Sequence, residues 1–125
     1  MKWSSFEELE VYQACREFRK EVSKIARKCF PPSEKFLLTA QILDSSRSVT
    51  ANIAEGYGRF YYKENIKFCR ISRGSLTETF EHLICAFDEG YITKAILDEK
   101  RPQYIRCLQL INGYIAYLQR QKGKE

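Results

Sequence analysis

The chain has 125 residues, of which 44% are hydrophobic and 30% charged, and its formal net charge is +5 at pH 7. This length and composition predict one folded domain over residues 1–125 and exclude a disordered chain. No apolar run reaches the ~20 residues of a membrane span, and acidic residues near the start exclude a secretory signal, so we expect a cytoplasmic protein. The positive charge favours a polyanionic partner such as nucleic acid.

The five cysteines are odd in number, and no two of them share a C-x-x-C spacing. A structural zinc site needs clustered thiolates with short paired spacings. The sequence therefore predicts reduced, mostly buried thiols that pack as small hydrophobic side chains, and it predicts neither a metal nor any other cofactor.

Apolar residues recur at alternating spacings of four and three in successive segments of the chain, which is typical of amphipathic helices. The first predicted helix spans about residues 5–28, with Ser5 as its N-cap, and two prolines stop the chain after it. The second begins at Ser33, the expected N-cap. It ends near residues 56–58, where a glycine in the left-handed conformation would close it.

The third predicted helix spans about residues 62–88. No capping side chain precedes it, so we expect Phe60 or Tyr61 to hold its start by packing. Thr93 is the expected N-cap of the fourth helix, and Pro102 predicts a kink or a fresh start within that helix. Four long helices with short connections and no strand pattern predict an all-α, antiparallel up-down-up-down four-helix bundle.

Small residues mark the predicted contact between the second and third helices. Antiparallel packing places Ser48 about level with Ser72, and Ser45 about level with Ser75, so slim side chains would allow the backbones to approach closely. A glycine inside a helix costs about 1 kcal/mol relative to alanine. We expect a neighbouring backbone packed against Gly74 to compensate for that cost.

The stretch A-N-I-A-E-G-Y-G-R at residues 51–59 reads as the end of the second helix, because it lacks the pattern of a phosphate-binding loop. Asn52 and Glu55 in this stretch, and Glu78 on the third predicted helix, need hydrogen-bond partners if they are buried, and we expect them to tie helices together. Gln41 is the expected partner of Glu78. The residues assigned to this structural motif are Asn52, Glu55, Gly56, Gly58, Ser75 and Glu78.

The same stretch, followed by K-E-N-I-K-F-C-R-I-S-R-G-S-L-T-E at residues 63–78 and G-Y-I at residues 90–92, resembles the four-helix-bundle family encoded by intervening sequences within bacterial 23S ribosomal RNA genes. The resemblance covers nearly the whole chain. It implies a ring-shaped homopentamer, and nothing in it implies an enzyme. A related group comprises the accessory proteins of diversity-generating retroelements, which are basic pentameric bundles that bind nucleic acid and partner a reverse transcriptase.

Five basic residues and one acidic residue stand between Gly56 and Leu76. Four of the five recur at helical spacing, beside aromatic residues, and a cationic ridge of this kind suits a phosphate backbone with bases able to stack. The alternative is a solvated helix face with its aromatic rings buried. The candidate nucleic-acid-binding residues are Arg59, Lys63, Lys67, Arg70 and Arg73.

A second basic set lies on the first helix and ranks lower, because Glu17 and Glu21 interleave with it. A metal site or a catalytic role at His82 is disfavoured, since the chain has one histidine and no accompanying nucleophile. The sequence favours a non-enzymatic, oligomeric protein that binds nucleic acid, with RNA preferred to DNA on family grounds. The alternative is a protein-interaction scaffold, such as an accessory subunit for a reverse transcriptase.

Overall fold

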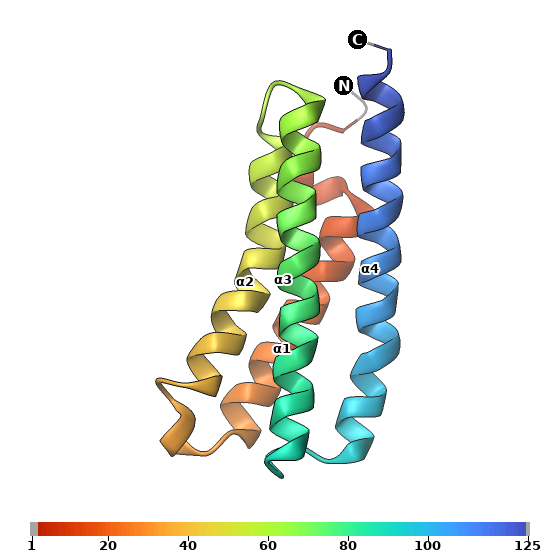
Figure 1. Ribbon diagram of the computed structural model, residues 1–125. Helices are drawn as coiled ribbons and strands as arrows, with labels where there is room; N and C mark the ends of the chain where they lie inside the picture. Colours follow the sequence, from red (N-terminus) through yellow and green to blue (C-terminus); the bar gives the residue numbers. More distant parts are fainter. Residues whose placement is uncertain (1–2, 125) are drawn as a thin grey trace.

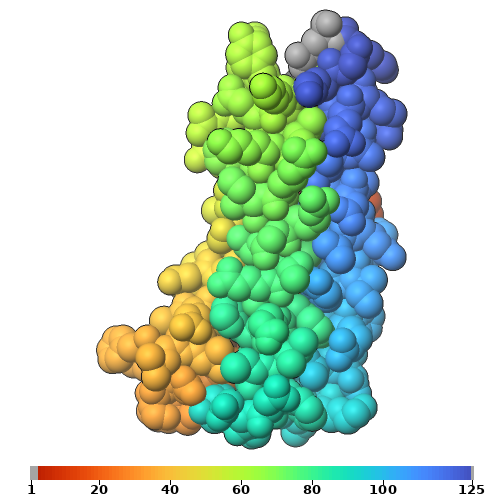
Figure 2. Space-filling view, viewed as in Figure 1, coloured from red at the N-terminus to blue at the C-terminus, as the bar shows by residue number. Residues whose placement is uncertain are grey.

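The computed structural model describes residues 3–124 and consists of four long helices without a β-strand in that range. The helices are α1 (Glu10–Cys29), α2 (Leu38–Tyr57), α3 (Tyr62–Asp88) and α4 (Lys94–Lys122). They run alternately up and down, and α4 closes the bundle against α1 (Figure 1). In the space-filling view, α3 lies along the middle of one face (Figure 2). The predicted all-α four-helix bundle is confirmed.

The starts of α1 and α2 differ from the prediction. Ser5 does accept a hydrogen bond from the Glu7 backbone N–H at 3.1 Å, but it caps a short 3₁₀ turn, Phe6–Glu8, and not α1 itself. The expectation that Ser33 caps α2 is wrong, because Ser33 lies in a second 3₁₀ turn. Glu34 takes over the capping role, since its carboxylate accepts from the Leu38 N–H at 3.2 Å.

Two further predictions concern the N-cap of α4 and the glycine that ends α2. Thr93 caps α4 as expected, because its Oγ1 accepts from the Ile96 N–H at 3.2 Å. The expectation of a left-handed glycine at residues 56–58 is wrong, because Gly58 has φ −75°. The left-handed position in the described chain is Gly90, with φ 81°, where the next N–H bonds back to the Ala86 carbonyl at 2.8 Å and closes α3.

The start of α3 is not held by the residues that the sequence suggested. Phe60 is 89% exposed and Tyr61 is 57% exposed, so neither packs into the bundle. Tyr62 packs against the core instead, and the buried Asn65 follows within the first turn. Further along the chain, α4 continues through Pro102 without a fresh start.

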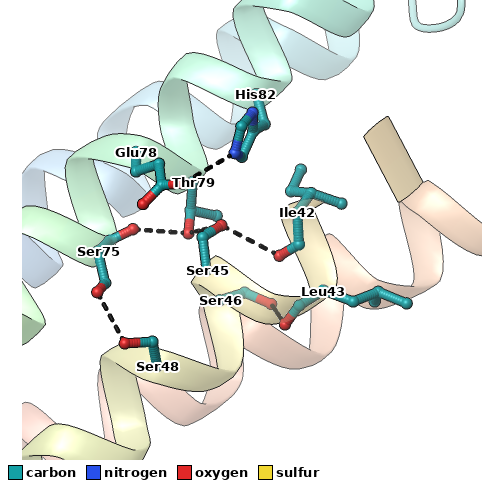
Figure 3. Close-up of polar contacts among 9 residues, drawn as sticks. All are labelled: Ile42, Leu43, Ser45, Ser46, Ser48, Ser75, Glu78, Thr79 and His82. Atoms are coloured by element: carbon teal, nitrogen blue, oxygen red, sulfur yellow. Dashed lines mark hydrogen bonds and ion pairs between the residues drawn. The ribbon is translucent and has the colours of Figure 1, made fainter. Parts of the chain in front are cut away.

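Slim polar side chains join α2 to α3, as predicted (Figure 3). The hydroxyl of Ser45 lies 2.8 Å from that of Thr79, and the hydroxyls of Ser48 and Ser75 are also 2.8 Å apart. Ser72 donates to a backbone carbonyl of α2 at 2.7 Å. The observed register is about one turn from the predicted one, because Ser48 is paired with Ser75 and not with Ser72.

The backbones of α2 and α3 approach each other closely at Gly56. A Cβ atom on Gly56 would lie 2.6 Å from Oδ1 of Asn65 and 3.0 Å from Cβ of Phe68. The expectation that Gly74 is packed under a neighbouring backbone is wrong, because nothing lies within 4 Å of a Cβ built there. Glycine is therefore required at Gly56, whereas at Gly74 it only weakens the helix.

Alanine substitutions at these two glycines should have opposite effects on stability. Gly56→Ala is expected to lower the free energy of unfolding by about 2 kcal/mol, because its methyl group overpacks the contact with Asn65 and Phe68. Gly74→Ala should raise it by about 1 kcal/mol, because the exposed helix interior gains a better helix former. Urea denaturation of the two variants measures both changes, and a loss of stability at Gly74 would contradict this account.

The cysteines are free thiols, as predicted. Cys15, Cys69 and Cys107 are buried, and the other two are partly buried. Burial raises the pKa of Cys69 to about 12, so this thiol stays protonated at neutral pH. These side chains behave as small hydrophobic groups of the core, which explains their place in the apolar stripes of the sequence.

Candidate nucleic-acid interface

Three of the predicted cations form an exposed row on the first half of α3. Lys63, Lys67 and Arg70 are all exposed, and their spacings of four and three place them on one side of the helix. Within residues 3–124, no ion pair, hydrogen bond or ring contact engages these three side chains. We call them the α3 cation row.

The charge pattern of α3 works against the stability of the helix. Neighbours in the α3 cation row carry like charges at spacings of four and three, which destabilises a helix. Lys63 also lies in the first turn, where the helix dipole favours an acidic side chain, although Glu64 in the same turn supplies one. Local features that cost stability without a structural return are expected at functional sites. The α3 cation row is a feature of this kind.

Arg59 differs from the row, because it is already paired. Its guanidinium lies 3.6 Å from the carboxylate of Glu55 and 3.7 Å from that of Glu64. The same group sits over the ring of Phe68, 4.8 Å from the ring centroid. The structure therefore places Arg59 beside the row, with much of its charge balanced by two carboxylates.

Arg73 also has a structural partner. Its side chain is partly buried, and Nη1 donates to Oδ1 of Asn112 on α4 at 2.8 Å. This bond turns Arg73 towards the α3–α4 seam and away from the exposed row. The five predicted cations thus separate into three unpaired side chains and two that hold local structure.

Of the polar residues in the predicted structural motif, Ser75 joins α2 to α3, but Asn52, Glu55 and Glu78 do not tie helices together as expected. Glu78 is exposed, and its carboxylate lies 3.3 Å from Nε2 of His82 on the same helix, so Gln41 is not its partner. Asn52 donates to the carbonyl and the hydroxyl of Ser48, again within one helix. Asn52 therefore supports the α2–α3 seam only through Ser48.

The sequence ranked the basic set of α1 second, and part of this set is neutralised in the structure, because Lys20 pairs with Glu17 at 3.7 Å. Glu21 accepts a hydrogen bond from the buried Lys100 of α4, which lowers the pKa of its carboxyl group, and the charge of Lys24 contributes to that lowered pKa. Arg47 of α2 joins the basic set of α1, where a groove opens between α1 and α2. We call it the α1–α2 groove, and its basic residues are Arg19, Lys20, Lys24 and Arg47.

Residues 7–113 match the family described as 23S rRNA-intervening sequence protein. The chain belongs to this family. It is also similar to the crystal structure of a protein of unknown function from the S23 ribosomal protein family of Bacteroides thetaiotaomicron, with 22% sequence identity and a TM-score of 0.77 over 85% of this chain and 95% of that chain. At this identity the likeness supports the fold. No curated protein matches the chain.

Two further features are absent from the described residues of this member of the 23S rRNA-intervening sequence protein family: a metal-binding cluster and a membrane-spanning helix. No group of three or more histidine, cysteine, aspartate or glutamate side chains there could hold a metal ion. No helix among the same residues is long and apolar enough to cross a bilayer.

The sequence did not single out Arg19 or Arg47 of this 23S rRNA-intervening sequence protein. Arg19 is partly buried and donates to Thr50 Oγ1 at 2.7 Å, which fixes it at the α1–α2 contact. Arg47 is exposed on the facing helix. Since the two belong to different helices, no spacing along one helix could have paired them; only the antiparallel packing of α1 on α2 brings them to one groove.

Proposed function

We propose that this chain is a non-enzymatic protein that binds nucleic acid through the α3 cation row, with RNA preferred to DNA. The observation that carries the proposal is the presence of three exposed cations without intramolecular partners on one side of α3, at spacings where like charges repel. The preference for RNA rests on the family to which the chain belongs. The α1–α2 groove offers a further set of cations to a strand that extends beyond α3.

Binding would draw its free energy mainly from counterion release. Each phosphate neutralised on a single strand contributes a slope of about −0.7 to the dependence of log affinity on log salt concentration. Three contacts through the α3 cation row therefore give a slope of about −2. Backbone contacts of this type fix the position of a strand without reading its sequence.

We also propose, on the family resemblance, that the chain assembles into a homopentamer. Ile71 on α3 and Ile105 on α4 are each 43% exposed and supply apolar surface for contacts between subunits. Fivefold repetition would multiply the α3 cation row around a ring and raise affinity through multivalency. Light scattering on protein freed of nucleic acid tests the subunit number, and a monomer under those conditions would contradict the assembly.

A fluorescence anisotropy titration tests nucleic-acid binding. A labelled single-stranded RNA and a DNA of the same sequence are titrated with protein at about 50 and about 200 mM salt. The expected result is saturable binding that weakens by roughly 20-fold over this salt range, with RNA bound more tightly. If neither the RNA nor the DNA strand associates with the protein in a salt-sensitive way, the proposal is contradicted.

A protein-interaction scaffold is the second candidate, and one surface feature favours it. Phe36 is 83% exposed and Leu37 is 58% exposed, next to each other just before α2. Exposed apolar side chains of this size often mark contacts with other proteins. If the scaffold function holds, Phe36→Ser and Leu37→Ser should abolish capture of a partner such as a reverse transcriptase, while charge reversal at Lys63 and Lys67 should leave capture intact.

A further inference from the structure

An aromatic pocket lies at the end of the bundle that carries both termini and the α2–α3 turn (Figure 1). The pocket has a volume of about 120 Å³ and an open mouth, so it is smaller than a typical site for a drug-sized molecule. Most of the residues that line it are aromatic, and we call it the end pocket.

One wall of the end pocket is built from rings that are held in place. The rings of Tyr114 and Tyr117 are nearly parallel, with centroids 6.3 Å apart. Trp3 meets both edge-on, and its backbone carbonyl accepts a hydrogen bond from the Tyr57 hydroxyl at 2.7 Å. This wall therefore presents fixed aromatic surface to whatever enters the pocket.

The opposite wall is different, because its rings stand in solvent. Phe60 and Tyr61 of the α2–α3 turn line the pocket but are 89% and 57% exposed. They contact each other edge to face, with centroids 4.8 Å apart. Large aromatic faces left in water beside a pocket favour a flat, apolar-faced ligand that would cover them.

Polar groups reach the pocket from its buried side. Asn65 is 7% exposed and donates from Nδ2 to the Tyr114 hydroxyl oxygen at 3.2 Å. Burial raises the pKa of Tyr114 to about 12, so its O–H proton is retained and can be donated to a ligand. Gly56 leaves room for the Asn65 side chain, because a Cβ atom at position 56 would clash with Oδ1 of Asn65.

The α3 cation row begins one residue after a residue that lines the end pocket. Tyr62 lines the pocket and Lys63 follows it directly in the first turn of α3. Arg59 also lines the pocket. A strand whose phosphates lie along Lys63 and Lys67 would thus have a base within reach of stacked rings and of hydrogen-bonding groups.

We propose that the end pocket takes the base of an unpaired nucleotide. The base stacks on the exposed rings of Phe60 and Tyr61 and on the fixed wall opposite, while its polar edge meets Asn65 and the Tyr114 hydroxyl. The pocket makes the protein selective for single strands, because a base held in a duplex cannot enter it. This inference rests on the proposed function for the path of the phosphates, but the recognition of the base is a separate property.

Trp3 is the chain's only tryptophan, so its fluorescence reports on the pocket directly. Adenosine, which has no phosphate, and ribose 5-phosphate, which has no base, are each titrated into the full chain with excitation restricted to tryptophan. Adenosine should quench Trp3 saturably, and ribose 5-phosphate should not. The proposal would be overturned if quenching by adenosine never saturated and only equalled the quenching of free N-acetyltryptophanamide. It would also be overturned if the change in Trp3 emission followed protein concentration and not adenosine concentration.

Two alanine variants and two control variants test whether adenosine binds at the exposed rings. Phe60→Ala and Tyr61→Ala should each weaken adenosine binding about tenfold, whereas Tyr61→Phe should retain it, because stacking on exposed rings is lost only in the first two. Phe36→Ala removes an equally exposed ring at the other end of the bundle and should change nothing. Equal thermal unfolding by circular dichroism shows that all four variants are folded, and adenosine binding that survives both alanine substitutions would contradict the proposed wall.

An RNA oligomer with one abasic site separates this inference from the proposed function. The abasic strand keeps its phosphates, so it should still bind with strong salt dependence but should quench Trp3 less than the intact strand. If both strands bind and quench equally, the pocket proposal fails and electrostatic binding stands. If adenosine quenches while neither strand binds, the pocket stands and the proposed function fails.

Discussion

Replacing Lys63, Lys67 and Arg70 together by glutamine should weaken binding to single-stranded RNA on the order of 100-fold at low salt. The reason is the loss of three phosphate contacts, each of which releases counterions. The slope of log affinity against log salt should become shallower by about 2. Anisotropy titrations of the wild-type and triply substituted proteins at several salt concentrations measure both quantities.

The same substitution should not destabilise the fold. It removes like-charge repulsion within α3 and one cation from the first turn, each worth a few tenths of a kcal/mol, so the midpoint of unfolding should stay or rise. The matched control replaces Lys28, Lys35 and Lys94 by glutamine, which removes the same charge from the opposite end of the bundle. If the control loses as much affinity as the α3 variant, net charge alone explains binding and the α3 cation row has no special role.

Glu21→Ala should lower the free energy of unfolding by about 3 kcal/mol. Lys100 is 4% exposed, and its ammonium group donates to the Glu21 carboxylate across the α1–α4 contact. Gln103 donates to the same carboxylate at 3.3 Å. Without Glu21, the buried ammonium group keeps only Gln103 and the exposed Glu99 as partners, and an undercompensated buried charge is strongly destabilising.

Glu17→Ala is the matched control for this prediction. Glu17 lies one turn earlier on α1 and pairs with Lys20 at 3.7 Å, but both side chains are exposed. Its removal should change stability by less than about 1 kcal/mol. Urea denaturation at neutral pH measures both variants, and equal losses would show that burial of Lys100 does not matter.

The ion pair also predicts how stability depends on pH. The hydrogen bond from Lys100 lowers the pKa of Glu21 in the folded protein. A depressed folded pKa means that the stabilisation is complete above the unfolded pKa of about 4.3 and is lost as the pH falls through the lower, folded value. The difference in stability between the wild type and Glu21→Ala should therefore shrink on acidification, and a difference that stays constant would contradict the pairing.

The sequence predicted the helices well because their signals are local. Apolar periodicity and the Thr93 cap depend on a few neighbouring residues, and the structure agrees with them. The register of α2 against α3 was predicted within about one turn, because Ser48 meets Ser75 instead of Ser72. Apolar periodicity shows which side of each helix is buried but not how far one helix is shifted along the other, and the close contact at Gly56 is likewise outside what it encodes.

The candidate site was predicted only in part, for a similar reason. Helical spacing identified Lys63, Lys67 and Arg70, which do lie on one exposed side of α3. It could not show that Arg59 meets two carboxylates or that Arg73 reaches across to α4. Such pairings depend on the path of the turn and on the packing of a helix that is distant in sequence.

Cross-linking tests the central claim most directly. A single-stranded RNA that carries 4-thiouridine is bound to the full chain, irradiated and digested, and the cross-linked peptides are identified by mass spectrometry. We predict cross-links within residues 57–73, which include the α3 cation row and the exposed rings of the turn. Cross-links confined to the α1–α2 groove, or none at a concentration where the RNA is bound, would contradict binding through α3.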